Sequence, residues 1–389
     1  MKLLILDLCN YIDYPLGGQL SFVKNLIKAF GKDAKLVGIS TEKQDPVGVW
    51  TKRMINGIDY DFFSVATVNK SFTRPLVPAR ISSIFRLRPY IDKVLKSIDY
   101  DLIFVQAPEL LFCLSDKTLS KTFMVLPGVE NPLSIARYPL ARKFQKLYDF
   151  FFMRKVEKIK YIFASADEKE LKRFIDRSKG KISRDRIIKY PTRYESSIYN
   201  IKDKEEERRH LNLPANAKIF TTVGRLSWFK GWKLMVDSYE QIFHKNKNSY
   251  LYFLGDGEDR DKINAYVKSK GMEDNVILVG SQLPAVVSSY LNASDVFIMG
   301  SYKEGWSTTL VEACACAVPC VITDFSSAEE MIKDGINGFV VKERNVDLFA
   351  SKILEASQIE RRSVIQFNAQ YESLAVSRMR DSIESIINK

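Results

Sequence analysis

Short apolar runs alternate with amphipathic stretches along almost the whole chain. Runs of this length, rich in β-branched and aromatic residues, are typical of strands buried in a sheet. They predict strands at residues 2–8, 35–40, 58–65, 102–105, 122–126 and 161–165 in the first half, and at 219–223, 250–254, 276–279, 296–299 and 319–323 in the second. Alternation in both halves predicts an α/β fold with two doubly wound parallel sheets, each in a Rossmann-like domain.

The stretches between the strands have the spacing of helices with one apolar face. They predict helices at residues 19–30, 84–98, 231–244, 259–271, 283–292 and 308–317. A chain of 389 residues is too long for one compact core. The best boundary is residues 190–209, where a Tyr-Pro pair precedes a charge run. We expect an N-terminal domain at 1–195, a C-terminal domain at 196–365, and a helix at 366–389 that packs back toward the first domain.

No run of 18 apolar residues is present, and residues 1–7 resemble a buried strand more than a signal peptide. The five cysteines do not form a disulfide framework, which favours a cytoplasmic protein. Cys314, Cys316 and Cys320 lack a nearby histidine and the usual zinc-ligand spacing, so buried small residues are a better interpretation than a metal site. We expect no metal and no cofactor.

The excess of positive charge over negative charge lies in the first half of the chain. Residues 1–200 hold 35 Lys and Arg against 21 Asp and Glu, and the remainder holds 24 against 26. Such a half attracts lipid headgroups, nucleic acid or an acidic polymer. Residues 137–160 alternate cations with aromatic residues, as interfacial helices do, and residues 74–96 hold a second basic cluster. Attachment to an anionic membrane is the preferred interpretation, and a core-packing helix with a lysine-rich outer face is the alternative. No nucleic-acid-binding module is recognisable, and we expect no nucleic-acid partner.

Two cations and two carboxylates mark a candidate site in the second half. Arg225 and Lys230 stand on a glycine-containing turn between a predicted strand and helix, where backbone N–H groups favour an anion such as a diphosphate. Glu304 and Glu312 bracket the start of the helix at 308–317, where carboxylates suit sugar hydroxyls and a ribose diol. The alternative for each pair is a solvated surface position. Together the two pairs predict a nucleotide-sugar site.

These residues carry a resemblance to the retaining glycosyltransferases of family 4, which have the GT-B fold. The Gly-Arg-Leu-x-x-x-Lys-Gly turn of that family is matched at 224–231. Its paired glutamates are matched by Glu304 and Glu312, and its closing segment resembles residues 330–340. The resemblance covers essentially the whole chain and is sharpest from 224 to 341.

The resemblance implies roles for individual residues. Arg225 and Lys230 would hold the donor diphosphate and stabilise the leaving group, Glu304 would orient the transferred sugar, and Glu312 would bind the ribose. These three, Arg225, Lys230 and Glu304, are the expected catalytic residues. The other expected donor-binding residues are Gly17, Gly18, Gly224, Ser281, Gly305, Trp306, Ser307, Thr308, Thr309 and Leu310.

One departure from the family concerns the first domain. Many members have a histidine facing the donor sugar, and this chain has Pro127 there. Glu109, Glu130 or Asn131 could take over that position. A second departure is Arg193, at a position where the family often has a turn. Arg193 either adds a cation to the cleft between the domains or has a structural role.

The sequence therefore predicts a retaining, metal-independent hexosyltransferase. The expected donor is a UDP-sugar, with a GDP-sugar as the alternative, and the expected acceptor is a glycan or lipid-linked sugar of cell-surface polysaccharide synthesis at the inner face of the membrane. Two rivals stay open. The first is an inactive partner subunit of the same fold, which Pro127 favours. The second is a nucleotide-sugar epimerase or hydrolase, which would act without an acceptor.

Overall fold

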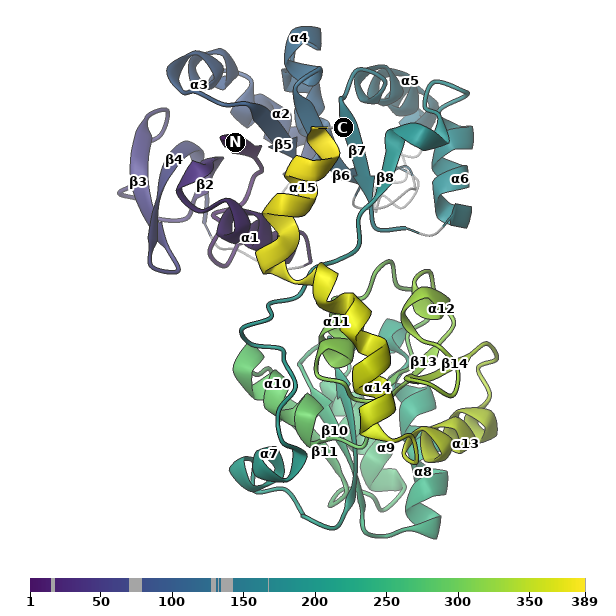
Figure 1. The fold of residues 1–389 in the computed structure, drawn as a ribbon. Helices are drawn as coiled ribbons and strands as arrows, with labels where there is room; N and C mark the ends of the chain where they lie inside the picture. Colours follow the sequence, from purple (N-terminus) through teal and green to yellow (C-terminus); the bar gives the residue numbers. More distant parts are fainter. Residues whose placement is uncertain are drawn as a thin grey trace. The chain divides into compact units, whose positions relative to one another are not determined.

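The computed structural model describes residues 1–14, 18–69, 79–126, 131, 133, 143–166 and 168–388. The chain divides into two compact units, Met1–Pro191 with Arg378–Lys389, and Thr192–Ser377 (Figure 1). The sequence predicted divisions after residues 195 and 365. In the structure, residues 192–195 and 366–377 belong to the second unit, and only the residues from Arg378 on return to the first. No helix among the described residues is long and apolar enough to cross a membrane.

The first unit is built on an eight-stranded sheet with the order β3-β4-β2-β1-β5-β6-β7-β8. Its strands are β1 Leu3–Leu6, β2 Ala34–Ser40, β3 Trp50–Ile55, β4 Ile58–Thr67, β5 Leu102–Val105, β6 Thr122–Leu126, β7 Tyr161–Ala164 and β8 Ile187–Lys189. All neighbours pair in parallel except β3 and β4. The predicted α/β class with parallel sheets is confirmed, and the pair of β3 and β4 adds one antiparallel edge to the first sheet.

The antiparallel edge has a local cause that the sequence contains. Asn56 and Gly57 both have positive φ, at 50° and 80°, and connect β3 directly to β4. An Asn-Gly pair with this backbone is the preferred two-residue hairpin turn. We did not predict β3 because its alternation of exposed and buried residues is weak, with only Ile55 fully buried.

The helices of the first unit cover both faces of this sheet, because successive residues of a strand point to opposite faces. Leu4 and Leu6 of β1 belong to one apolar core, and Leu3 and Ile5 to another. The first core is covered by α2 Ala79–Leu87, α3 Ile91–Ser97, α4 Asp116–Leu119, α5 Gln145–Val156 and α6 Glu168–Arg177. The second is covered by α1 Gly18–Phe30 and α15 Met379–Ile387.

One predicted helix is in fact two. Residues 84–98 form the end of α2 and the whole of α3, with a turn between them at residues 88–90. Pro89 lies in this turn, and a proline inside a helical pattern disfavours the helical conformation of the residue before it.

The second unit has a six-stranded, wholly parallel sheet with the order β11-β10-β9-β12-β13-β14. Its strands are β9 Lys218–Val223, β10 Ser249–Leu254, β11 Val276–Gly280, β12 Val296–Met299, β13 Cys320–Thr323 and β14 Gly338–Val341. One face is covered by α8 Trp232–Lys245, α9 Arg260–Ser269 and α13 Val346–Ala356. The other carries α10 Pro284–Ala293, α11 Thr308–Ala315 and α12 Ala328–Met331, and α7 Lys204–His210 and α14 Arg361–Asn368 complete the unit.

Candidate active site

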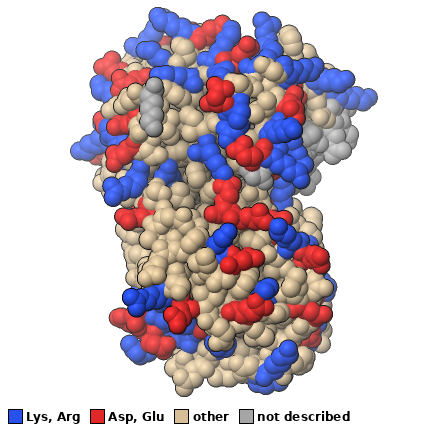
Figure 2. All heavy atoms as spheres, turned by 45° about the vertical axis from the view of Figure 1, so that its right-hand side comes forward, with Lys and Arg blue, Asp and Glu red and all other residues tan. Residues whose placement is uncertain are grey.

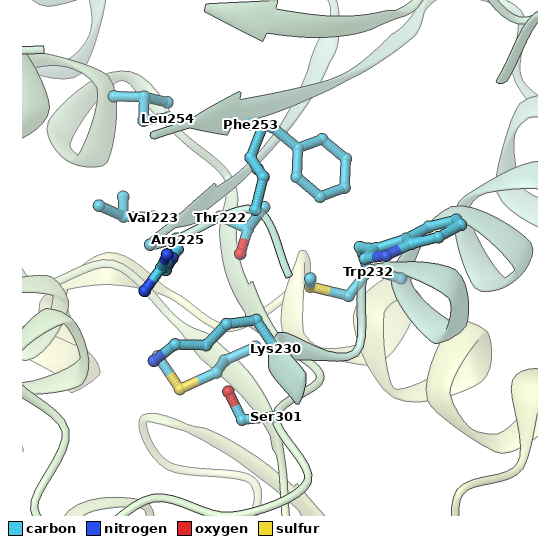
Figure 3. Close-up of a pocket in the computed structure, with 12 residues that line it drawn as sticks. Thr222, Val223, Arg225, Lys230, Trp232, Phe253, Leu254 and Ser301 are labelled. Atoms are coloured by element: carbon cyan, nitrogen blue, oxygen red, sulfur yellow. The ribbon is translucent and has the colours of Figure 1, made fainter. Parts of the chain in front are cut away.

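The candidate site lies at the carboxyl ends of β9 and β12 in the second unit. β9 pairs with β10 on one side and with β12 on the other, so the strand order reverses between these two neighbours. In open α/β sheets, ligands bind at such a switch point, beyond the carboxyl ends of the strands. A pocket there is lined by residues that include Gly224, Arg225, Lys230, Trp232 and Ser301 (Figure 3).

The turn after β9 has a backbone that depends on close packing. Gly231 has a φ of 70° and forms the N-cap of α8. A Cβ atom at Gly231 would lie 1.7 Å from the carbonyl oxygen of Gly300, in the turn after β12. Only glycine permits this approach, which brings the two turns of the site into contact.

Lys230 and Glu304, which are 74 positions apart in sequence, meet in this site. The Lys230 Nζ atom lies 2.5 Å from Glu304 Oε1, and the hydroxyl of Ser301 donates to the same oxygen at 2.7 Å. Both side chains retain partial access to solvent, at 32% for Lys230 and 15% for Glu304. The structure therefore brings together one predicted diphosphate ligand and the predicted sugar ligand.

Arg225 lies on the same turn but is more exposed. Its Nε atom is 3.0 Å from Glu258 Oε2, and 72% of its side chain is accessible. In Figure 3 the side chains of Arg225 and Lys230 extend to the same side of the end of β9. A dianionic group at that position would meet both cations, and each charge-assisted contact contributes about 1.5–3 kcal/mol.

Glu312 lies in α11, within hydrogen-bonding contact of the Tyr199 hydroxyl. Burial raises the pKa of the Glu312 carboxyl to about 8, and the hydrogen bond from Tyr199 opposes that rise. The same contact and burial raise the pKa of Tyr199. A carboxyl short of solvent partners can exchange hydrogen bonds with the hydroxyls of a ligand.

The other predicted donor residues of the second unit follow the carboxyl ends of β9, β11 and β12, in turns or in the first turn of α11. Gly305 and Trp306 use their carbonyl oxygens to accept hydrogen bonds from Ser327 and Thr192, both at 3.0 Å. Ser307 is the N-cap residue of α11, whose first residues are Thr308, Thr309 and Leu310. Leu310 is fully buried in the core, so its side chain cannot contact a ligand. Ser281 is exposed in the turn after β11.

The structure describes only some of the site residues that were predicted in the first unit. Gly18 begins α1, whereas Gly17, Pro127 and Glu130 lie outside the described residues. Glu109 is buried, and the Asn131 side chain accepts from Leu133 N and donates to the carbonyl of Gln145. Both polar atoms of the Asn131 amide therefore have backbone partners among the described residues.

Arg193 is buried in the second unit and donates to the carbonyl of Ser373. Of the two roles considered for it, this geometry favours the structural one. Cys314, Cys316 and Cys320 are buried as well.

Several neighbours of the site were not anticipated from the sequence. Ser301, Glu258 and Tyr199 each contact a predicted site residue. The sequence could have indicated Glu258 as a site residue, because it follows β10 in a turn that should reach the same sheet edge. No sequence pattern indicated Tyr199, since it precedes the second sheet and meets Glu312 only through tertiary packing.

Comparison with known proteins identifies relatives of part of this chain. Residues 203–370 match the family model described as glycosyl transferases group 1. The chain is 32% identical over 138 residues to a lipopolysaccharide 1,6-galactosyltransferase of Salmonella typhimurium, covering 35% of this chain and 38% of that protein. It is 26% identical over 212 residues to an uncharacterized glycosyltransferase of Methanocaldococcus jannaschii, covering 53% and 51%. The chain thus spans about half or less of the length of these curated relatives.

Solved structures resemble the whole chain. A sucrose-phosphate synthase from Thermosynechococcus elongatus superimposes with a TM-score of 0.73 at 15% identity, covering 99% of this chain and 98% of that one. The Anabaena protein HepE, in complex with UDP and glucose, gives 0.69 at 17% identity and covers both chains completely. Residues 203–370 therefore form a domain of the glycosyl transferases group 1 family, in a chain that has the GT-B fold.

Proposed function

We propose that this protein is a retaining, metal-independent glycosyltransferase that moves a hexose from a nucleotide-diphosphate donor to a glycan or lipid-linked acceptor. The observation that carries the proposal is the meeting of Lys230 and Glu304 at the switch point of the second sheet. A cation for the diphosphate and a carboxylate for the sugar would then act at one place in the site.

The leaving group defines what the protein must supply. When the bond between the anomeric carbon and the phosphate oxygen breaks, its electron pair leaves with the nucleoside diphosphate. Arg225, Lys230 and the N–H groups at the start of α11 would stabilise this negative charge, which is the kind of interaction that contributes most to many enzymes. These fixed positive groups are the reason to propose that no metal ion is required.

The acceptor completes the reaction. Its hydroxyl oxygen would form the new bond to the anomeric carbon on the face that the diphosphate leaves, and its proton would pass to the departing phosphate oxygen. Attack on that face retains the anomeric configuration. Glu304 would hold the sugar hydroxyls, and the Glu312 carboxyl would hold the ribose.

Relatives support the substrate classes. HepE has been solved with UDP and glucose, and a relative from Escherichia coli, 23% identical over 192 residues, is named as a UDP-galactose-dependent transferase acting on a diphosphoundecaprenol-linked sugar. We therefore propose a UDP-sugar donor, with a GDP-sugar as the alternative, and a role in cell-surface polysaccharide synthesis. A cytoplasmic enzyme attached peripherally to the membrane would fit the excess of cations in residues 1–200.

Calorimetric titration with UDP, GDP and ADP tests the donor site. We expect micromolar binding of one nucleotide, weakened at least tenfold by Lys230→Ala, which corresponds to about 1.4 kcal/mol. Lys233→Ala is the matched control. Lys233 lies in the first turn of α8, is 62% exposed and pairs with Asp237 outside the site. Absence of binding by all three nucleotides would refute the proposal.

Turnover then separates the remaining alternatives. Nucleotide release only in the presence of an acceptor glycan would support a transferase. Release without an acceptor would indicate a hydrolase, and tight nucleotide binding with no turnover of any UDP- or GDP-sugar would indicate an inactive partner subunit.

A further inference from the structure

One helix of the first unit is apolar on its exposed side. Around α5, the side chains of Phe144, Leu147, Phe150 and Phe151 are 56%, 53%, 52% and 49% exposed. Positions three and four apart lie on one face of a helix, so these four form a continuous stripe, which we call the α5 stripe. Phe150 and Phe151 contact each other with ring centroids 5.2 Å apart.

The opposite side of α5 packs into the core and anchors the helix on the first unit. Phe152, Met153 and Val156 are buried in the core of the first unit. A surface helix normally has polar residues opposite such a buried side, and a helix that is apolar on both sides normally has both sides covered. The α5 stripe is therefore a candidate contact surface.

We propose that the α5 stripe docks on an anionic lipid bilayer, with its four apolar side chains at the boundary between headgroups and acyl chains. The proposal rests on the proposed function in one respect, since it would bring the enzyme to a lipid-linked acceptor. Its physical basis is independent of the reaction.

The charge around the stripe matches this occupant. Lys146 and Arg154 are exposed on α5, and the Arg154 guanidinium lies 5.4 Å from the centre of the Phe150 ring. The Lys181 ammonium approaches the same ring at 5.8 Å. Aromatic side chains surrounded by cations are the composition of helices that lie in the interface of anionic membranes.

The nearby carboxylates offset this charge only in part, because Lys146 and Arg154 stay exposed while Lys181 and Arg177 have acidic partners. Asp149 lies 3.2 Å from Arg177, and Glu157 lies 3.9 Å from Lys181. Residues 143–189 as a whole hold 15 Lys and Arg against 7 Asp and Glu. In Figure 2 the part of the first unit that carries α5 and α6 is turned forward, and blue atoms are dense there.

The same charge argues against a second copy of the chain as the occupant. Two copies that met through their α5 stripes would bring two basic surfaces together and would repel each other. An anionic bilayer satisfies both the apolar side chains and the cations.

Co-sedimentation with vesicles tests the proposal on the whole 389-residue chain. The probes are vesicles of phosphatidylcholine alone and vesicles with a third of phosphatidylglycerol. We expect binding to the anionic vesicles only, a fall in the partition coefficient of at least tenfold for Phe150→Ser combined with Phe151→Ser, and a similar fall for Lys146→Glu combined with Arg154→Glu. High salt should weaken the binding of the wild type.

Met54→Ser is the matched control. Met54 is 60% exposed on β3, at the opposite edge of the same sheet from β7 and β8, so its loss removes an exposed apolar side chain without touching the stripe. This variant should bind vesicles like the wild type. UDP titration of every variant shows whether the second unit is intact, and far-UV circular dichroism shows whether the first unit is folded.

The two proposals can fail separately. A wild type that binds UDP but ignores anionic vesicles would overturn the docking proposal and leave the transferase proposal standing. Vesicle binding that depends on the α5 stripe, without any nucleotide binding, would do the reverse. Vesicle binding that the stripe variants leave unchanged, or a dimer that they dissociate, would also overturn docking through α5.

Discussion

At the scale of single residues, the site is held in a charge-neutral state by its own side chains. Glu304 accepts from both Lys230 and Ser301, and Arg225 pairs with Glu258. An incoming diphosphate must compete with these carboxylates for the cations.

Glu304→Gln should separate binding from transfer. Removal of the carboxylate charge frees Lys230 for the diphosphate, so UDP should bind at least as tightly as to the wild type. The rate of sugar transfer should fall by about 10²–10³, as it does when one electrostatic contact to a transition state is lost. Calorimetry and a transfer assay measure the two effects, and a UDP affinity that fell in parallel with the rate would contradict the assigned role.

Glu312 should make stability depend on pH in an identifiable direction. Its pKa is about 8 in the folded protein against 4.5 for the ordinary side chain, so the folded state holds the proton more tightly. The stability contributed by this proton is complete below about 4.5 and is lost as the pH rises through about 8. Relative to Glu312→Gln, the wild type should thus be more stable at pH 6 than at pH 9. Urea unfolding midpoints at the two pH values measure this, and a constant difference would show that the carboxyl is not buried as described.

At the scale of elements, the site depends on the contact between the turns after β9 and β12. The backbone of Gly231 touches that of Gly300, and Gly255 after β10 approaches the backbone of Gly224 in the same manner. A Cβ at Gly255 would lie 2.0 Å from the Gly224 carbonyl oxygen. The strand ends of the second sheet are therefore spaced by glycines, and the side chains of Lys230 and Glu304 meet as a result.

Gly231→Ala should damage both stability and binding. The added methyl group would collide with the Gly300 carbonyl at a positive φ, and backbone strain alone costs about 1–3 kcal/mol. Displacement of the turn should also weaken UDP binding, which calorimetry would detect. Gly271→Ala is the control, because Gly271 has a similar φ of 64° with nothing within 4 Å of its Cβ position. Equal losses in the two variants would mean that strain, and not the contact with Gly300, accounts for the effect.

At the scale of the whole molecule, the chain returns to its first unit at its end. α15 lies beside α1 (Figure 1), and its Met379 and Ile383 are fully buried in the same core as Leu3 and Ile5. The Tyr161 hydroxyl donates to the carbonyl of Ile387 at 2.9 Å. The first unit is thus completed by residues that are synthesised after the second.

Ile383→Ala should destabilise the first unit selectively. Truncation of a buried isoleucine costs about 2–5 kcal/mol. Trp50 lies in the first unit and Trp228, Trp232 and Trp306 in the second, so a variant that keeps only Trp50 would report the first transition in urea. We expect the midpoint of this transition to fall, while UDP binding persists in an Ile383→Ala variant that keeps all four tryptophans. Ser385→Ala, at an exposed position of the same helix, is the control. Equal shifts for both variants would contradict the packing of α15.

The sequence predicted the interior of the fold better than its edges. The bounds of β5, β6 and β12 agree with the predicted strands, because these central strands are buried on both faces and appear as uninterrupted apolar runs. β3, β8 and β14 were not predicted. All three lie at sheet edges, where half-exposed residues blur the pattern.

By itself, the sequence determined that this chain has two α/β units, and it marked the glycine turn after β9 and the two glutamates that follow β12. Those features are local, since periodicity and turn chemistry act over a few residues. Only the tertiary structure decided which groups meet. The pairing of Lys230 with Glu304, the contact of Tyr199 with Glu312 and the exposure of the α5 stripe all join or expose residues through packing. Such contacts depend on the order of strands in a sheet and on which helix face remains uncovered, and neither is encoded in any short segment.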